Sequence, residues 1–237
     1  SGDTALVGAP EDDHAGGTSA GSVYEFVRSG TTWTEQTKLT ASDAGAGLQF
    51  GTSVDHLGDT AVGGALDDNA GAGAGSVYVF VHSGTSWVEQ AKLIASDTAA
   101  LDFFGSSVSL SGDTVLVGAP KPTGGAAYVF VRSGTSWSEQ AKLIGSDTAA
   151  GDGFGGSVEL WGDVAVIGAS LDDNSGGTNS GSAYVFVRSG TNWTEVMKLT
   201  ASDPAAHDAF GSSVGLLDGM LLVGADSDDH PGAVNAG

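Results

Sequence analysis

The chain has 237 residues, of which 40% are hydrophobic and 39 are glycine, so it can bury a core but must turn often. Its 29 acidic residues against 8 basic ones give a formal net charge of −21, which disfavours nucleic acid and anionic membranes as partners and favours cations. Cysteine is absent, which excludes disulfides and thiolate chemistry, and no apolar run reaches the ~20 residues of a membrane-spanning helix.

An internal repeat of 50–56 residues organises the chain. The sequence Phe-Gly recurs at Phe50, Phe104, Phe154 and Phe210, and tryptophan recurs at Trp33, Trp87, Trp137 and Trp193. Each full repeat contains four strand-like runs, here named A to D. In chain order the sequence shows runs B, C and D, then three complete sets, and then runs A and B.

The four runs differ in pattern. Run A starts at Phe-Gly and reaches run B through a two-residue turn such as Gly58-Asp59 or Gly162-Asp163, which is a strong hairpin signal. Runs B and C are apolar on both alternating faces, as expected of strands that are covered on both sides. Run D alternates polar and apolar residues and carries charges, which indicates an outer, partly exposed strand.

This pattern predicts an all-β fold, a β-propeller-like array of four-stranded antiparallel blades. The expected blades are residues 48–101, 102–151 and 152–207, with a partial first blade at 1–47 and a partial last blade at 208–237. An open solenoid of the same sheets and a β-sandwich are the alternatives. Glu25 stands where other repeats have valine, which predicts a more open setting for the first blade.

The residues at the ends of runs A and B carry a family resemblance. Phe-Gly opens run A, and Gly8-Ala9-Pro10 or Gly118-Ala119-Pro120 closes run B. These motifs resemble FG-GAP repeats, the blade units of the integrin α-subunit propeller and of many bacterial surface proteins. The resemblance implies an extracellular or cell-surface location. It also implies a calcium loop of the pattern Asp-x-Asp-x-Asp-Gly between runs A and B, but the bare Gly-Asp turn occupies that place here.

The long loops between runs B and C and between runs D and A carry more than half of the acidic residues, all on one side of the predicted blades. Oxygen ligands on glycine-rich loops suit Ca²⁺, whereas the simpler interpretation is that Asp and Asn form turns and remain solvated. The candidate Ca²⁺ ligands are Asp12, Asp13, Asp67, Asp68, Asn69, Asp97, Asp102, Asp147, Asp152, Asp172, Asp173, Asn174, Asp203, Asp208, Asp228 and Asp229.

These observations favour a non-enzymatic structural or adhesive protein that presents an acidic loop face. A lectin-like module that binds glycans or proteins is the alternative, and a hydrolase or lyase is the third hypothesis. The incomplete sets of runs predict unpaired strand edges, which either self-association or the remainder of a longer polypeptide would cover. No catalytic residue is predicted.

Overall fold

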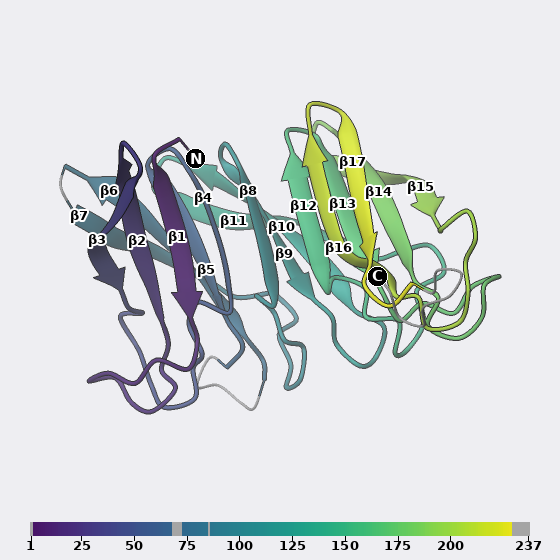
Figure 1. The fold of residues 1–237 in the computed structure, drawn as a ribbon, viewed down its shortest axis with the longest axis horizontal. Helices are drawn as coiled ribbons and strands as arrows, with labels where there is room; N and C mark the ends of the chain where they lie inside the picture. The colour runs from purple at the N-terminus through teal and green to yellow at the C-terminus, as the bar shows by residue number, and fades with distance from the viewer. Residues whose placement is uncertain (1, 68–72, 85, 229–237) are drawn as a thin grey trace. The chain divides into compact units, whose positions relative to one another are not determined.

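The computed structural model describes residues 2–67, 73–84 and 86–228, and its regular structure consists of β-strands (Figure 1). The strands are β1 (Thr4–Ala9), β2 (Ser22–Ser29), β3 (Thr32–Leu39), β4 (Ser53–Leu57), β5 (Thr60–Ala65), β6 (Ser76–Ser83), β7 (Ser86–Leu93), β8 (Ser107–Ser111), β9 (Thr114–Ala119), β10 (Ala126–Ser133), β11 (Ser136–Leu143), β12 (Ser157–Trp161), β13 (Val164–Ala169), β14 (Ser182–Ser189), β15 (Asn192–Leu199), β16 (Phe210–Leu217) and β17 (Met220–Ala225). None of the described residues lies in a helix that could cross a membrane.

The strands form repeated sheets in which neighbours in sequence are neighbours in space. Three sheets have four strands, in the orders β4-β5-β6-β7, β11-β10-β9-β8 and β12-β13-β14-β15. The sheet that precedes them has the order β1-β2-β3, and the sheet that follows them contains β16 and β17. These sheets are propeller-like blades in which the strands follow runs A to D, so the predicted all-β repeat fold is confirmed.

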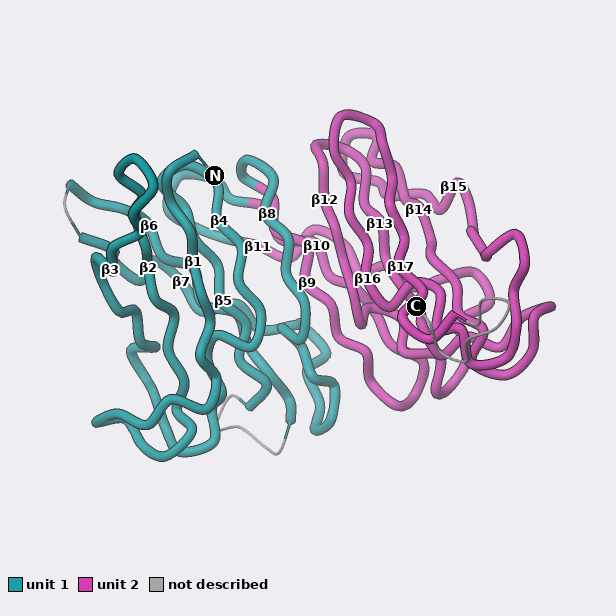
Figure 2. Tube along the Cα trace, viewed as in Figure 1, with its two compact units in different colours: residues 1–113, 132–137 teal, residues 114–131, 138–237 magenta. Residues whose placement is uncertain are grey.

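The chain divides into two compact units, which are coloured separately in Figure 2. The first unit comprises residues 1–113 and 132–137, and the second comprises residues 114–131 and 138–237.

The strand order follows from burial and from turn chemistry. Every residue of β5 and β9 is buried, as the apolar faces of run B predict, whereas β3, a run D strand, is largely exposed. Gly58 and Gly162 begin the turns between runs A and B with φ of 59° and 58°, and Asp218 does so with φ of 49°. Left-handed residues suit two-residue hairpin turns. The long loops therefore leave the opposite ends of the strands.

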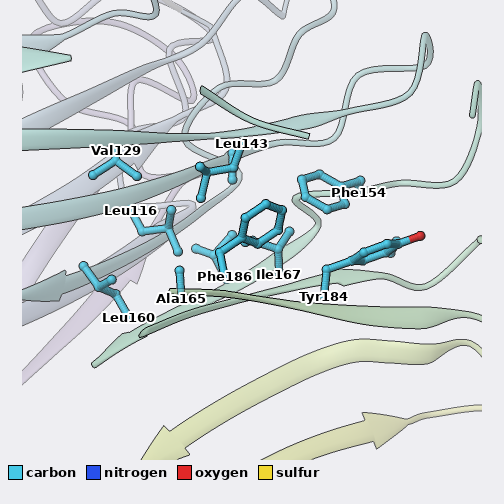
Figure 3. Close-up of a cluster of buried hydrophobic side chains, with 12 residues drawn as sticks. Leu116, Val129, Leu143, Phe154, Leu160, Ala165, Ile167, Tyr184 and Phe186 are labelled. Carbon is cyan, nitrogen blue, oxygen red and sulfur yellow. The ribbon is translucent and has the colours of Figure 1, made fainter. Parts of the chain in front are cut away.

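The core of each unit lies between consecutive sheets. In the first unit, Phe50 meets Tyr78 edge-on, with ring centroids 5.4 Å apart, and it also packs against Phe80. In the second unit, Phe154 and Tyr184 repeat this arrangement at 5.2 Å (Figure 3). Leucine, isoleucine, valine and alanine side chains from both sheets fill the remainder, so within each unit one blade buries its apolar face against the next.

Tryptophans of run D connect consecutive blades at their outer edges. The indole Nε1 of Trp193 donates to Gln140 Oε1 at 3.1 Å in the second unit, and Trp137 makes the same bond to Gln90 at 2.9 Å in the first. The guanidinium carbon of Arg188 lies 5.3 Å from the centroid of the Trp193 ring. These two tryptophans thus link a run D strand to the preceding blade.

The first blade is more open than later ones, as the sequence predicts, because β1 is only partly buried where β5 and β9 are fully buried. Glu25 itself nevertheless lies on a buried face, with 8% exposure. Its neighbour is His56. Later in the chain, Val129 stands in the place of Glu25 and Leu160 in the place of His56. Val129 and Leu160 belong to one apolar cluster. Burial lowers the pKa of His56, whereas the negative charges of Asp55 and Glu25 act to raise it. A polar pair therefore replaces an apolar one.

Candidate functional site on the loop side of the blades

Phe-Gly pairs attach the long loops of one blade to the next. Phe50 forms a parallel bridge with Gly21, and Phe154 forms the same bridge with Gly125. Both phenylalanines are fully buried. A Cβ atom on Gly21 would lie 2.2 Å from the carbonyl oxygen of Phe50, so this approach of two backbones requires glycine. In these two repeats the strand starts three residues after the phenylalanine, at Ser53 and Ser157, rather than at Phe-Gly as expected.

The loops between runs D and A are shaped by buried aspartates. Asp102, Asp152 and Asp208 are 5%, 6% and 1% exposed. Each carboxylate accepts a hydrogen bond from the backbone N–H three residues earlier, at 2.9, 2.6 and 2.5 Å. Burial raises the pKa of Asp152 despite this bond, and the negative charge of Asp172 adds to the effect. These carboxylates hold the turn in place, which accounts for their recurrence.

A second aspartate in the same loops binds the next blade. Asp147 accepts from the Tyr184 hydroxyl at 2.8 Å and from Lys198 Nζ at 2.6 Å. The hydrogen bond from Lys198 lowers the pKa of Asp147 against the opposing effect of burial. Lys198 also reaches Asp172 at 2.9 Å, and its ammonium lies 5.2 Å from the centre of the Tyr184 ring. One lysine therefore links two acidic loops.

The first unit contains the same arrangement. The carboxylate of Asp43 accepts from the Tyr78 hydroxyl at 2.6 Å and from Lys92 Nζ at 2.7 Å. Burial acts to raise the pKa of Asp43, but the bonds from Lys92 and Tyr78 outweigh it and lower the pKa. The neighbouring Ser42 donates from its backbone N–H and its hydroxyl to the Glu89 carboxylate, at 2.8 and 2.7 Å.

The acidic pairs of the B-to-C loops are also bound internally. Asp12 accepts from Ser22 Oγ at 2.7 Å and pairs with Lys38 at 2.5 Å. Asp13 accepts the backbone N–H of Ser19 at 2.7 Å. In the corresponding loop of the second unit, Ser182 donates to Asp172 at 2.5 Å, and the N–H of Asn179 donates to Asp173 at 2.8 Å.

His14 and Asn174 occupy equivalent places and have the same role. The N–H of Gly16 donates to His14 Nδ1 at 3.0 Å, which leaves Nε2 to donate to the Gly21 carbonyl at 3.0 Å. The Asn174 amide likewise accepts from Gly176 and donates to the Gly181 carbonyl, at 2.9 and 2.6 Å. The side chain at this position thus holds the loop together by hydrogen bonds to its backbone, a role that the sequence does not reveal.

The candidate Ca²⁺ ligands therefore have several destinations. Where the residues are described, no three His, Asp or Glu side chains form a group that could hold a metal ion. Many of the carboxylates already accept from serine, lysine, tyrosine or backbone donors, so Ca²⁺ at those places would have to displace them. Asp67, Asp97, Asp203 and Asp228 lie in the loops as expected, whereas Asp68, Asn69 and Asp229 lie outside the described residues. Calcium binding stays a prediction.

A pocket of about 270 Å³ opens on the loop side of the first unit. Leu66, Leu101 and Phe103 form its apolar wall, and Gln49 and Asp67 add polar groups. Sequence reasoning missed these apolar residues. The available signal was their departure from the repeat, because the places of Leu101 and Phe103 are held by glycines 151 and 153 in a later copy.

A larger pocket of about 450 Å³ lies beside the β16–β17 hairpin in the second unit. Glu159, Leu217, Met220 and Leu222 line it, and the three apolar side chains are exposed. Leu222 corresponds to Val166, which is fully buried one sheet earlier. This pocket is therefore part of a sheet face that is covered in the preceding blade.

Repeated four-stranded antiparallel sheets with long acidic loops on one side define an all-β repeat protein built of propeller-like blades. Comparison with known protein families finds FG-GAP repeats at residues 33–80, 87–130, 137–186 and 193–237. The chain therefore belongs to the FG-GAP repeat family, as its motifs indicate. Such repeats are typically non-enzymatic, integrin-like modules of extracellular or surface proteins. No curated protein matches the chain.

The position of these matches is informative. The first three start in a run D strand of one sheet and end in a run C strand of the next, as in the match from β3 to β6. The family unit thus contains the contact between two blades, including the D-to-A loop and its Phe-Gly pair.

Proposed function

We propose that this protein is a non-enzymatic adhesive or structural module of the cell exterior, whose acidic loop side binds positively charged partners. The observation that carries the proposal is that the loop carboxylates divide into buried ones that bind their own loop and exposed ones that face solvent. Aspartates such as Asp102 and Asp152 hold the loops in shape from within, while exposed ones such as Asp203 and Asp226 add negative charge outside. A shaped, acidic surface favours cationic partners and repels anionic ones.

Two further parts of the proposal concern calcium and assembly. Ca²⁺ would bind among the loop carboxylates that remain exposed. Self-association would use the sheet that contains β16 and β17, where Met220 and Leu222 are 65% and 67% exposed. Exposed apolar sheet faces of this kind are typical interaction surfaces.

A lectin-like role is the second candidate, and one observation favours it. Phe103 is an aromatic residue that lines a pocket in the loops, where the ring of a sugar could stack.

The experiment is to immobilise the chain and measure binding of polylysine and polyglutamate at low and high salt. We expect polylysine to bind and to dissociate as salt screens the loops, and polyglutamate not to bind. Equal binding of both polymers would contradict the proposal. Calorimetric titration of the chelated protein with Ca²⁺ tests the calcium part separately. We expect binding in the millimolar range or tighter. The absence of both binding heat and any Ca²⁺-dependent shift in Tm would exclude calcium binding.

A further inference from the structure

The loop pocket of the first unit differs from the equivalent loops of the other repeats. Leu101 and Phe103 adopt left-handed φ values of 66° and 52°. The equivalent residues later in the chain are Gly151 and Gly153, and then His207 and Ala209. The same left-handed backbone recurs at Gly47 and Gln49 before Phe50, so it belongs to the loop of every repeat. Left-handed backbone is unfavourable for large side chains. This copy therefore differs from the others in carrying two bulky apolar residues at these positions.

The strained residues are held in place by a neighbouring loop. The backbone N–H of Phe103 donates to the Gly73 carbonyl at 2.8 Å. A Cβ atom on Gly73 would lie 2.8 Å from the Phe103 ring, so the ring can rest there because residue 73 has no side chain. Leu101 is 50% exposed. The loops thus support an apolar wall that is still accessible to solvent.

The surroundings of this wall are acidic. Asp67 lines the pocket, and Gln49 in its lining donates from Nε2 to the Glu11 carboxylate at 3.0 Å. With a formal net charge of −21, the chain offers little attraction to an anionic ligand. An apolar wall with an aromatic ring and a nearby carboxylate suits a ligand that has an apolar stem and a cationic end.

The protein itself shows how this fold binds such a group. Lys92 lies 5.2 Å from the Tyr78 ring centre and 2.7 Å from an Asp43 oxygen. Lys198 repeats this geometry with Tyr184 and Asp147, at 5.2 and 2.6 Å. An aromatic ring and an aspartate therefore form a recurrent internal lysine site.

We propose that the pocket lined by Leu66, Asp67, Leu101 and Phe103 binds a lysine side chain of a partner protein. The stem of the lysine lies along the leucines and the Phe103 ring, and the ammonium is directed to Asp67. The volume of about 270 Å³ suits a single side chain, since it is below the ~300–1,000 Å³ typical of small-molecule sites. The inference rests on the proposed function, because it names the group that the acidic loop side recognises.

The test titrates the 237-residue chain with the peptide acetyl-Gly-Lys-Gly-amide and follows backbone amide shifts by NMR. We expect shifts at Gly73, Leu101 and Phe103, with a Kd in the millimolar range. The same peptide with norleucine in place of lysine should bind at least tenfold more weakly, because it lacks the ammonium. Equal affinity for the two peptides, or tighter binding of a methyl glycoside than of the lysine peptide, would overturn the inference.

Variants identify the pocket. Leu101→His combined with Phe103→Ala installs the residues found at His207 and Ala209, which this fold accepts at left-handed φ. Asp67→Asn removes the carboxylate, and Asp226→Asn is a matched loss of charge in the second unit. We expect the double substitution and Asp67→Asn each to weaken the affinity for the lysine peptide at least tenfold, and Asp226→Asn to leave that affinity unchanged. An equal loss of affinity in both asparagine variants would indicate general charge attraction and would overturn the inference that this pocket is the binding site.

The two proposals fail separately. If polylysine binds the immobilised chain but the lysine peptide does not, the pocket inference is wrong and the proposed function stands. If polylysine does not bind, the proposed function itself is wrong.

Discussion

The close approach of two glycine backbones offers a sharp test of the fold. A Cβ atom added at Gly168 of β13 would lie 2.0 Å from the carbonyl oxygen of Gly211 and 2.3 Å from Ser157 Oγ. Ordinary contacts of this kind need roughly 1 Å more, so the neighbouring loop must move. That movement would also disturb the 2.8 Å hydrogen bond from Ser157 Oγ to the Gly211 carbonyl.

We therefore expect Gly168→Ala to destabilise the protein. Overpacking costs about 1–3 kcal/mol and the lost hydrogen bond about 1 kcal/mol, so the free energy of unfolding should fall by about 3 kcal/mol. For a chain of this size, Tm should then fall by roughly 6–12 °C.

The assay is urea and thermal unfolding, with Gly215→Ala in β16 as the matched control. A Cβ atom at Gly215 meets no atom within 4 Å, so this variant should be neutral or slightly stabilised. Equal stabilities of the two variants would refute the contact between Gly168 and Gly211 and, with it, the packing of β13 on the next Phe-Gly pair.

Two further predictions concern the lysine-linked loops. Lys198→Met leaves Asp172 buried without its ammonium partner, so the free energy of unfolding in urea should fall by about 2 kcal/mol. The loss is smaller than for a fully buried pair because Lys198 is partly exposed. Adding Asp172→Asn should recover part of the loss, and an unchanged urea midpoint for Lys198→Met would contradict the link. Burial and the bond to Asp43 raise the pKa of Tyr78 to about 12 from an ordinary value of 10, so the unfolded chain loses this proton first and stability should fall as pH rises from 10 to 12. Ultraviolet titration of the folded protein should show this late ionisation, and ionisation of all tyrosines near pH 10 would exclude it.

Much of the fold could be predicted because repetition makes local signals reinforce one another. The doubly apolar run B predicted the buried β5 and β9, and the turn at Gly162 predicted one hairpin. The burial of Glu25 could not be predicted, because His56, whose pKa the charge of Glu25 acts to raise, is 31 residues away and belongs to the next blade. A single strand pattern contains no information about such a partner.

The loop chemistry was less accessible from sequence. Counting acidic residues predicted an acidic loop side, but the pattern could not show that Lys198 joins Asp147 to Asp172, because these residues come together only when three segments pack. The pocket at Leu101 and Phe103 was missed for the opposite reason. Attention to what the repeats share hides the positions where one copy differs.

The placement of buried Glu25 near the partly buried His56 bears on how nearly identical blades keep their order. Blades that resemble one another this closely can exchange places during folding or between molecules, a characteristic failure of repeat proteins. If the first blade packed against a copy that carries Leu160 in place of His56, the carboxylate of Glu25 would be buried against hydrocarbon at a cost of several kcal/mol. This cost disfavours the wrong pairing, and it therefore favours the second blade as the neighbour of the first.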